Sequence, residues 1–228
     1  MKTIGSGTIG LIGGIGPEST VDYYRLIVAA RPGASVVINS VDMKRVLGPI
    51  ASGDLDSVAQ YLADEVQRLA RAGADFAAIT AITAHIVFDR VRDASPIPVV
   101  SLLDAVRDRV QASGWTKVGL IGTRYTMSGT FVSDVFSQAG IAIVTPDTDE
   151  QTYIHDKYFN ELVRGIIDPQ TRDGIVRVID RMAARDAIEA LIIGGTDFSP
   201  MLRAVANPPV PFLDVTKIHV DRLMELSQ

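Results

Sequence analysis

The hexapeptide Thr-Ile-Gly-Leu-Ile-Gly at residues 8–13 has a close counterpart in Lys-Val-Gly-Leu-Ile-Gly at residues 117–122. Each copy is a short apolar run that leads into glycines, which is typical of a buried strand followed by a tight loop. A second apolar stretch, at 77–81, is matched at 191–195, and a proline-led apolar stretch follows each of them. The sequence therefore predicts a duplicated α/β unit.

Short apolar stretches alternate with longer segments of helical periodicity, the pattern of a parallel sheet covered by helices on both faces. The clearest helix is expected from Asp54 to Ala72, where apolar residues recur every three or four positions and Gly73 follows. The predicted fold class is α/β, with two pseudo-symmetric lobes, each a mostly parallel sheet flanked by helices. The expected strands lie near 8–13, 35–40, 75–80, 97–101, 117–121, 141–144, 189–194 and 210–213.

No Pro- or Ser-rich linker divides the two halves. We expect an N-terminal lobe formed by residues 1–102 together with 215–228, because a last helix folds back on it, and a C-terminal lobe over 103–214. In open parallel sheets ligands bind beyond the carboxyl ends of the strands. Two such lobes facing each other predict a ligand cleft between them.

The composition of this 228-residue chain argues against several classes of binding partner. Its net charge is −5 with no long basic run, which argues against nucleic acid. No apolar run reaches the ~18 residues of a membrane span, and no signal-peptide core is present, so we expect no membrane partner and a cytoplasmic location. The chain has no cysteine, and His85, His155 and His219 lack the close spacing of zinc motifs, so we predict no metal.

The glycine-rich segment at residues 13–20 suggests a dinucleotide-binding loop. It lacks the fingerprint, because Ser19 stands where the third glycine would be and Pro17 removes a backbone donor. Pro17 followed by Glu18 instead indicates an ordinary helix start, whose free N–H groups favour a small anion such as a carboxylate. The alternative is that these glycines only allow the turn to form.

Other strand ends also carry polar residues. Thr83 could present its hydroxyl to a ligand, whereas the nearby His85 could be a catalyst or a packed or capping residue. In the second half, Thr126 lies at a helix start, where it could equally be an N-cap. Asp197 is the only acidic residue in these strand-end glycine loops, and it too could be a helix cap.

The segment Gly-Gly-Ile-Gly-Pro-Glu-Ser-Thr at 13–20, with Asp-Tyr-Tyr at 22–24, resembles the Gly-Gly-x-x-Pro-Glu-Ser-Thr signature of the aspartate/glutamate racemase family. Segments 83–85, 122–127 and 214–219 support this resemblance, in the right order, across nearly the whole chain. The resemblance implies two lobes with the substrate between them, a homodimer, and catalysis without pyridoxal phosphate or another cofactor.

The chain departs from that family where chemistry is expected. Active members use two cysteines, in Cys-Asn-Thr-x-His and Gly-Cys-Thr-Glu motifs, and these positions read Ala81 and Gly195 here. Two-base racemisation requires a proton acceptor on each face of the α-carbon, and neither residue has a titratable group. The motif asparagine is also replaced, by Ile82, which indicates a substrate less polar than aspartate, or none.

Three functions remain open. In the first, which we favour, the protein binds a small carboxylate or amino acid and performs elimination, isomerisation or hydrolysis without a thiol. In the second it is a binding pseudoenzyme, and in the third a slow racemase that uses other bases. The candidate catalytic residues are Asp197, His85, Thr80 and Tyr125. The candidate ligand-binding residues are Gly14, Ser19, Thr20, Ile82, Thr83, Thr123, Thr126 and Thr196.

Overall fold

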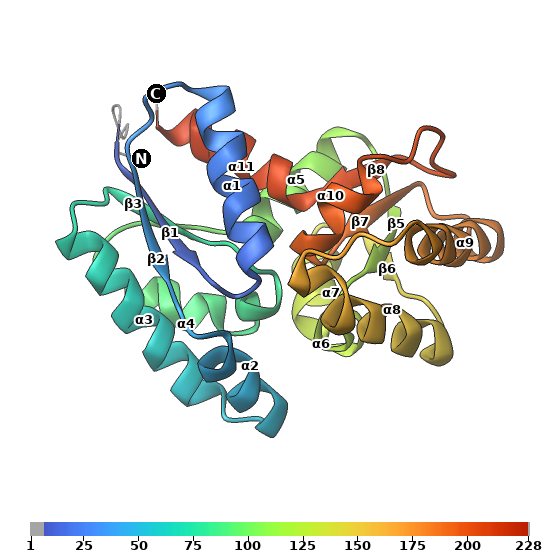
Figure 1. Cartoon of the computed structure of the whole chain (residues 1–228), viewed down its shortest axis with the longest axis horizontal. Helices are drawn as coiled ribbons and strands as arrows, with labels where there is room; N and C mark the ends of the chain where they lie inside the picture. Colours follow the sequence, from blue (N-terminus) through green and yellow to red (C-terminus); the bar gives the residue numbers. More distant parts are fainter. Residues whose placement is uncertain (1–6, 228) are drawn as a thin grey trace. The chain divides into compact units, whose positions relative to one another are not determined.

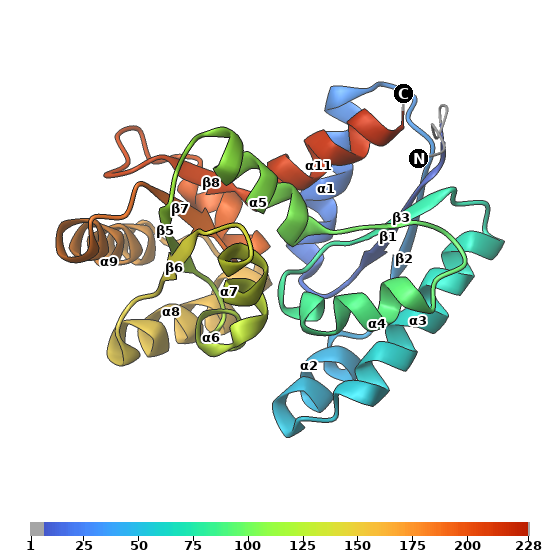
Figure 2. The same cartoon turned by 180° about the vertical axis from the view of Figure 1, so that it is seen from behind.

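The structure is a computed structural model that describes residues 7–227 (Figures 1 and 2). These residues form two compact units. The first contains the described residues up to Leu102 and those from Thr216 onward, and the second spans Leu103–Val215. Among residues 7–227, none of the helices is long and apolar enough to cross a membrane.

Each unit contains a four-stranded sheet in which every pairing is parallel. The strand orders are equivalent, β2-β1-β3-β4 in the first unit and β6-β5-β7-β8 in the second. The predicted α/β class is therefore confirmed, and each predicted strand forms within two residues of its expected bounds. The strands are β1 (Ile9–Gly13), β2 (Val36–Ser40), β3 (Phe76–Ile79), β4 (Val99–Val100), β5 (Lys117–Ile121), β6 (Ala142–Val144), β7 (Ala190–Ile193) and β8 (Phe212–Asp214).

Helices connect these strands, as parallel pairing requires. The expected helix from Asp54 to Ala72 is observed as α3 (Leu55–Arg71). The other helices of the first unit are α1 (Pro17–Ala30), α2 (Met43–Ser52), the 3₁₀-helix η1 (Thr83–Val87), α4 (Phe88–Asp93) and α11 (Val215–Leu226). The rest are α5 (Leu102–Ala112), α6 (Arg124–Ser128), α7 (Thr130–Ser137), α8 (Thr148–Asn160), η2 (Leu162–Arg164), α9 (Pro169–Asp186), η3 (Thr196–Phe198) and α10 (Ser199–Leu202).

Alternate residues of β1 face different helices. Leu11 belongs to a buried cluster that includes Tyr23 of α1 and Val220 of α11, and both views show these two helices side by side (Figures 1 and 2). A Cβ at Gly10 would lie 3.2 Å from the Leu69 side chain of α3. The C-terminal helix therefore completes the core of the first unit, and the central strand is covered on both faces.

The second unit buries its sheet against α8 and α9. Ile121 and Leu191, on neighbouring strands, belong to one cluster with Ile154 and Tyr158 of α8 and with residues of α9 such as Ile179. These apolar side chains recur at helical spacing, so each helix presents one buried stripe to the sheet.

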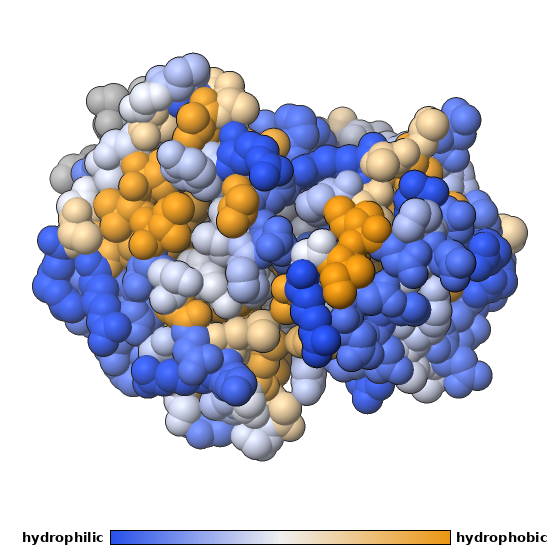
Figure 3. Space-filling model, in the orientation of Figure 1, coloured by the Kyte–Doolittle hydropathy of each residue, from blue (hydrophilic) through white to orange (hydrophobic). Residues whose placement is uncertain are grey.

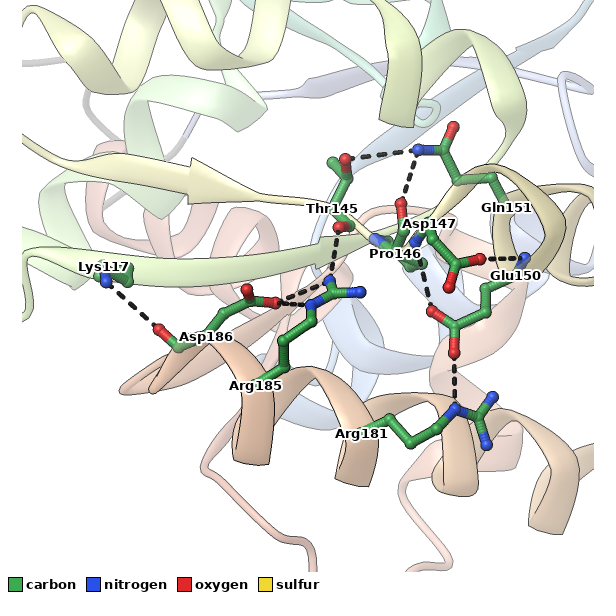
Figure 4. A network of polar contacts seen from close by, with 9 residues as sticks. All are labelled: Lys117, Thr145, Pro146, Asp147, Glu150, Gln151, Arg181, Arg185 and Asp186. Atoms are coloured by element: carbon green, nitrogen blue, oxygen red, sulfur yellow. Dashed lines mark hydrogen bonds and ion pairs between the residues drawn. The ribbon is translucent and has the colours of Figure 1, made fainter.

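A polar network joins the start of α8 to α9 and β5 (Figure 4). Asp147 caps α8 by accepting a hydrogen bond from the Glu150 amide at 2.9 Å, and the Glu150 carboxylate accepts one from the Asp147 amide at 3.2 Å. Glu150 also accepts a 2.7 Å hydrogen bond from Arg181 of α9. Lys117, the first residue of β5, donates to the Asp186 carbonyl at 3.2 Å, so ends of three elements are tied together.

The surface seen in Figure 3 is largely hydrophilic, with separate apolar patches. Scattered exposed apolar side chains are normal for folded proteins. The large ones among the described residues are Val21, Tyr24, Ile38, Ile166 and Ile167.

Candidate functional site

The carboxyl ends of β1 and β3 are neighbours in the first unit. These two strands mark the topological switch point of the sheet, since the order β2-β1-β3-β4 reverses there, and such points are where open α/β sheets bind ligands. The loop after β1 needs its glycines: Gly14 has a φ of 86°, and a Cβ on it would lie 2.4 Å from the Val41 carbonyl oxygen. The predicted site residues of the first unit lie in this loop, in the first turn of α1 and in the segment that follows β3.

The hydroxyl groups of three candidate site residues hold these segments together: Ser19 and Thr20, predicted to bind a ligand, and Thr80, a catalytic candidate. Thr20 Oγ1 accepts a hydrogen bond from the Gly14 amide at 2.9 Å, and Ser19 Oγ donates to the Thr80 carbonyl at 2.8 Å. Thr80 Oγ1 donates to the Ile12 carbonyl at 3.1 Å. The structure thus brings Ser19 and Thr80 together. The side chains of Ser19, Thr20 and Thr80 are all buried.

The Ala81–His85 segment is buried as well. Ala81, Ile82 and Thr83 are 5, 3 and 6% exposed. His85 bonds at both ring nitrogens, with Nδ1 2.9 Å from the Ala81 carbonyl and Nε2 accepting from the Leu102 amide at 3.1 Å. Its ring also stacks on Phe88 with centroids 5.1 Å apart. These contacts support the packed-residue interpretation of His85 over the catalytic one.

In the second unit, the corresponding switch point lies between β5 and β7. The two loops approach so closely that a Cβ at Gly122 would lie 2.9 Å from the Gly194 carbonyl oxygen. Thr123 is the N-cap of α6, and its Oγ1 lies 3.1 Å from the Oγ1 of Thr126. The N-cap alternative considered for Thr126 is therefore not observed: Thr123, three residues earlier, is the cap, because sequence alone did not show where the loop enters the helix.

Asp197 lies in η3, which follows the glycine loop after β7, and is 4% exposed. Its carboxylate accepts a hydrogen bond from the hydroxyl of Tyr158, a buried residue of α8. Burial, followed by the neighbouring Asp197 charge, raises the pKa of Tyr158 well above its usual value, so the phenol stays protonated. Thr196, predicted to bind a ligand, precedes Asp197 and is 2% exposed.

Sequence reasoning missed Tyr158. The spacing of Ile154, Tyr158 and Leu162 marks it as a residue of a buried helical stripe. Nothing local, however, connects it with an aspartate 39 residues further along.

Aromatic residues surround the position of the second missing cysteine. A Cβ at Gly195 would lie 2.7 Å from Phe198 Cδ2 and 3.0 Å from Tyr158 Cε2. The rings of Phe198 and Tyr158 have centroids 5.2 Å apart. Aromatic carbon atoms therefore occupy the space that a side chain at position 195 would need.

Tyr125, another candidate catalytic residue, lies on α6, and its ring is nearly perpendicular to that of His155, with 6.3 Å between the centroids. The Arg124 amide donates to His155 Nδ1 at 3.1 Å. Burial, and then the charge of Arg124, lowers the pKa of His155, which favours the neutral ring that this hydrogen bond requires. The pairs Tyr125–His155 and Tyr158–Asp197 are separate contacts. No cluster of acidic or histidine side chains within residues 7–227 could hold a metal ion.

These features define a duplicated, doubly wound α/β protein whose polar loops gather at equivalent strand ends of two sheets. The family model of the Asp/Glu/Hydantoin racemases matches residues 12–223, and the chain belongs to that family. This confirms the resemblance found in the sequence, and the absence of cysteine from the chain sets it apart from thiol-dependent members.

Three similar proteins illustrate the relationship. A candidate Asp/Glu racemase from Yersinia pestis is 32% identical, with a TM-score of 0.84, over 97% of this chain and 99% of that chain. An aspartate racemase homologue from Pyrococcus horikoshii OT3 is 30% identical, with a TM-score of 0.81, over 97 and 99% of the two chains. The broad specificity amino-acid racemase RacX of Bacillus subtilis is 21% identical over 172 residues, 71% of each chain.

Proposed function

We propose that this protein binds a small carboxylate or amino acid and transfers a proton with Asp197 as its single base, in an elimination or isomerisation that needs no thiol and no cofactor. The family and the amino-acid racemases among its relatives support the ligand class. The Tyr158–Asp197 pair carries the assignment of the base, because it is a buried acid and phenol at the switch point of the second sheet.

The other candidate bases are less suitable. The amide of Leu102 can only donate, so the lone pair of His85 Nε2 is already used as an acceptor. Thr80 donates its hydroxyl proton to a backbone carbonyl and is a weak base at neutral pH. Ala81 and Gly195 have no titratable group. A base on one face of a carbon atom supports elimination or isomerisation, whereas two-base racemisation requires one on each face.

Tyr158 would then be the partner of the reacting carboxylate. While Asp197 is ionised, the phenol donates to one of its oxygens and leaves the other to accept a substrate proton. When Asp197 has taken that proton, the same hydrogen bond keeps the carboxylic acid in one orientation for the return step or for protonation of a leaving group. Ile82, at the position of the motif asparagine, supports a substrate less polar than aspartate.

The first test is exchange of the substrate α-proton with solvent. We incubate the protein with each enantiomer of aspartate and glutamate in D₂O and follow the α-position by NMR. We expect no exchange at the rate of thiol-bearing relatives. Fast exchange would contradict the single-base proposal and support the racemase alternative instead.

The second test is a panel of small carboxylates, amino acids and hydroxy acids, screened by NMR for consumption. Asp197→Asn should reduce any turnover found by about 10²-fold or more, the usual contribution of a general base. His85→Gln is the matched control, since its amide oxygen can still accept from Leu102, and it should keep most of the activity. Turnover that survives Asp197→Asn rules out the assigned base.

The binding pseudoenzyme remains the second candidate, favoured by one observation: Tyr158 already engages Asp197, and both side chains are buried. For a pseudoenzyme, we expect calorimetry to show saturable binding of one of the screened carboxylates or amino acids, and NMR to show no chemical change in that compound. The resemblance also predicts a homodimer, which light scattering after size-exclusion chromatography would measure.

A further inference from the structure

Two buried histidines of the first unit contact the same short segment, Val100–Leu102. His219 Nε2 lies 3.1 Å from the Val100 carbonyl oxygen, and His85 Nε2 lies 3.1 Å from the Leu102 amide nitrogen. This segment leads from β4 into α5, where the chain leaves the first unit. His219 lies on α11, three residues after the chain returns to that unit at Thr216.

The partners determine where each ring carries its proton. The Leu102 amide can only donate, so His85 Nε2 must be an acceptor, and the proton of this neutral ring is on Nδ1, facing the Ala81 carbonyl. The Val100 carbonyl can only accept, so His219 carries a proton on Nε2. In the neutral ring, His219 Nδ1 then accepts from the Tyr23 hydroxyl at 2.8 Å. The two rings are therefore opposite tautomers.

Each ring also contacts a second segment of the first unit. His85 holds the carbonyl of Ala81, the residue at the position where family resemblance places the first cysteine. His219 holds Tyr23 of α1, the helix that follows β1. Together the rings connect chain segments that follow β1, β3 and β4 with the C-terminal helix. With exposures of 4% for His85 and 0% for His219, solvent does not compete for these hydrogen bonds.

We propose that His85 and His219 are paired positioning residues, which hold the Val100–Leu102 segment and the Ala81 backbone in place through opposite neutral tautomers. This inference does not depend on Asp197 or on any enzymatic turnover, so its test is independent of the test of the proposed function.

The direct test is a long-range ¹H–¹⁵N correlation spectrum of the full chain labelled with ¹⁵N-histidine, recorded at neutral pH. The chain has three histidines, so single substitutions assign every ring. We expect the Nδ1–H tautomer for His85 and the Nε2–H tautomer for His219. His155 is an internal reference that should also be Nε2–H, because its Nδ1 accepts from Arg124. An Nε2–H or tautomer-averaged His85, or an Nδ1–H His219, would overturn the proposal.

A second measurement tests the positioning role through amide hydrogen exchange of Leu102. In His85→Gln the side-chain oxygen can take the place of the Nε2 acceptor, whereas in His85→Asn the shorter side chain cannot reach. Leu102 should exchange at least about tenfold faster in His85→Asn than in His85→Gln, and His155→Asn should leave it unchanged. Equal rates in all three variants would contradict the role. The tautomer spectrum uses the unaltered chain, so it decides the proposal even if His85→Asn does not fold.

Discussion

At the scale of single residues, packing and not backbone conformation restricts which side chain position 195 can accept. Its φ of −123° and ψ of 114° are extended values that any residue adopts. A Cβ there, however, would lie 2.7 and 2.8 Å from ring atoms of Phe198. A cysteine could therefore not be restored at this position without moving the aromatic ring.

We predict that Gly195→Ala lowers the free energy of unfolding by about 1–3 kcal/mol, the usual cost of overpacking a core. In a Phe198→Leu background the same change should cost less, because the smaller side chain frees space, and the difference measures the coupling of the two sites. Urea unfolding of the four proteins in this cycle provides the values. Strict additivity of the two changes would show that Phe198 does not restrict position 195.

Tyr158 supplies the hydrogen bond to a buried carboxylate, and removing its hydroxyl should be costly. We expect Tyr158→Phe to destabilise the fold by about 1–3 kcal/mol, because Asp197 loses a donor where water does not readily replace it. Tyr24→Phe, on a side chain with 50% exposure, is the matched control and should change stability by less than about 0.5 kcal/mol. Similar effects of the two changes would argue against an important Tyr158–Asp197 hydrogen bond.

At the scale of elements, the start of α8 depends on a reciprocal pair of hydrogen bonds. Asp147 and Glu150 form a capping box, and Glu150 extends it to Arg181 of α9 (Figure 4). Asp149 lies in the same first turn but is not the cap. Both aspartates interact favourably with the helix dipole, but it is Asp147 that accepts a hydrogen bond from a backbone amide, that of Glu150.

Asp147→Ala should therefore cost about 0.5–2 kcal/mol, as the loss of an N-cap does. Asp149→Ala should cost no more than the dipole contribution of about 0.3–1 kcal/mol. Thermal unfolding followed by circular dichroism compares the two variants with the parent chain. A larger effect at Asp149 would contradict the assigned cap.

At the scale of the whole molecule, His219 links folding to pH. Burial, and then the neighbouring His85, lowers its pKa from 6.5 to about 3. Between these values the unfolded chain binds a proton that the folded chain does not, so stability falls as the pH decreases from about 6.5 toward 3. The contribution is fully present above pH 6.5, where the ring is neutral in both states.

We expect the parent chain to lose up to about 2 kcal/mol more stability than His219→Gln between pH 7.5 and pH 5, at about 1.36 kcal/mol per pH unit below the unfolded-state pKa. Denaturant unfolding at several pH values gives the comparison. His155→Gln measures the smaller contribution of the second histidine with a lowered pKa. Parallel pH profiles of the parent and His219→Gln would contradict a pKa near 3.

The duplicated α/β fold could be predicted from the sequence, because the apolar runs 8–13 and 117–122 and the regular spacing in 54–72 are local patterns typical of buried strands and an amphipathic helix. The family could also be predicted from the sequence, because its signature at residues 13–20 is one contiguous segment. The absence of thiols at Ala81 and Gly195 was equally visible, since it concerns residue types and not positions in space.

The hydrogen-bond partners of the polar side chains could not be predicted in this way, because these partners are distant in the chain and meet only in the folded protein. Asp197 meets Tyr158 across 39 positions, and Tyr23 meets His219 across 196. His85 presented one pattern with two interpretations, a catalyst or a packed residue, and the donor at Leu102 favoured the second. A hydrogen bond depends on the direction and distance of two groups, and these are defined only when the sheets and helices that hold those groups have packed.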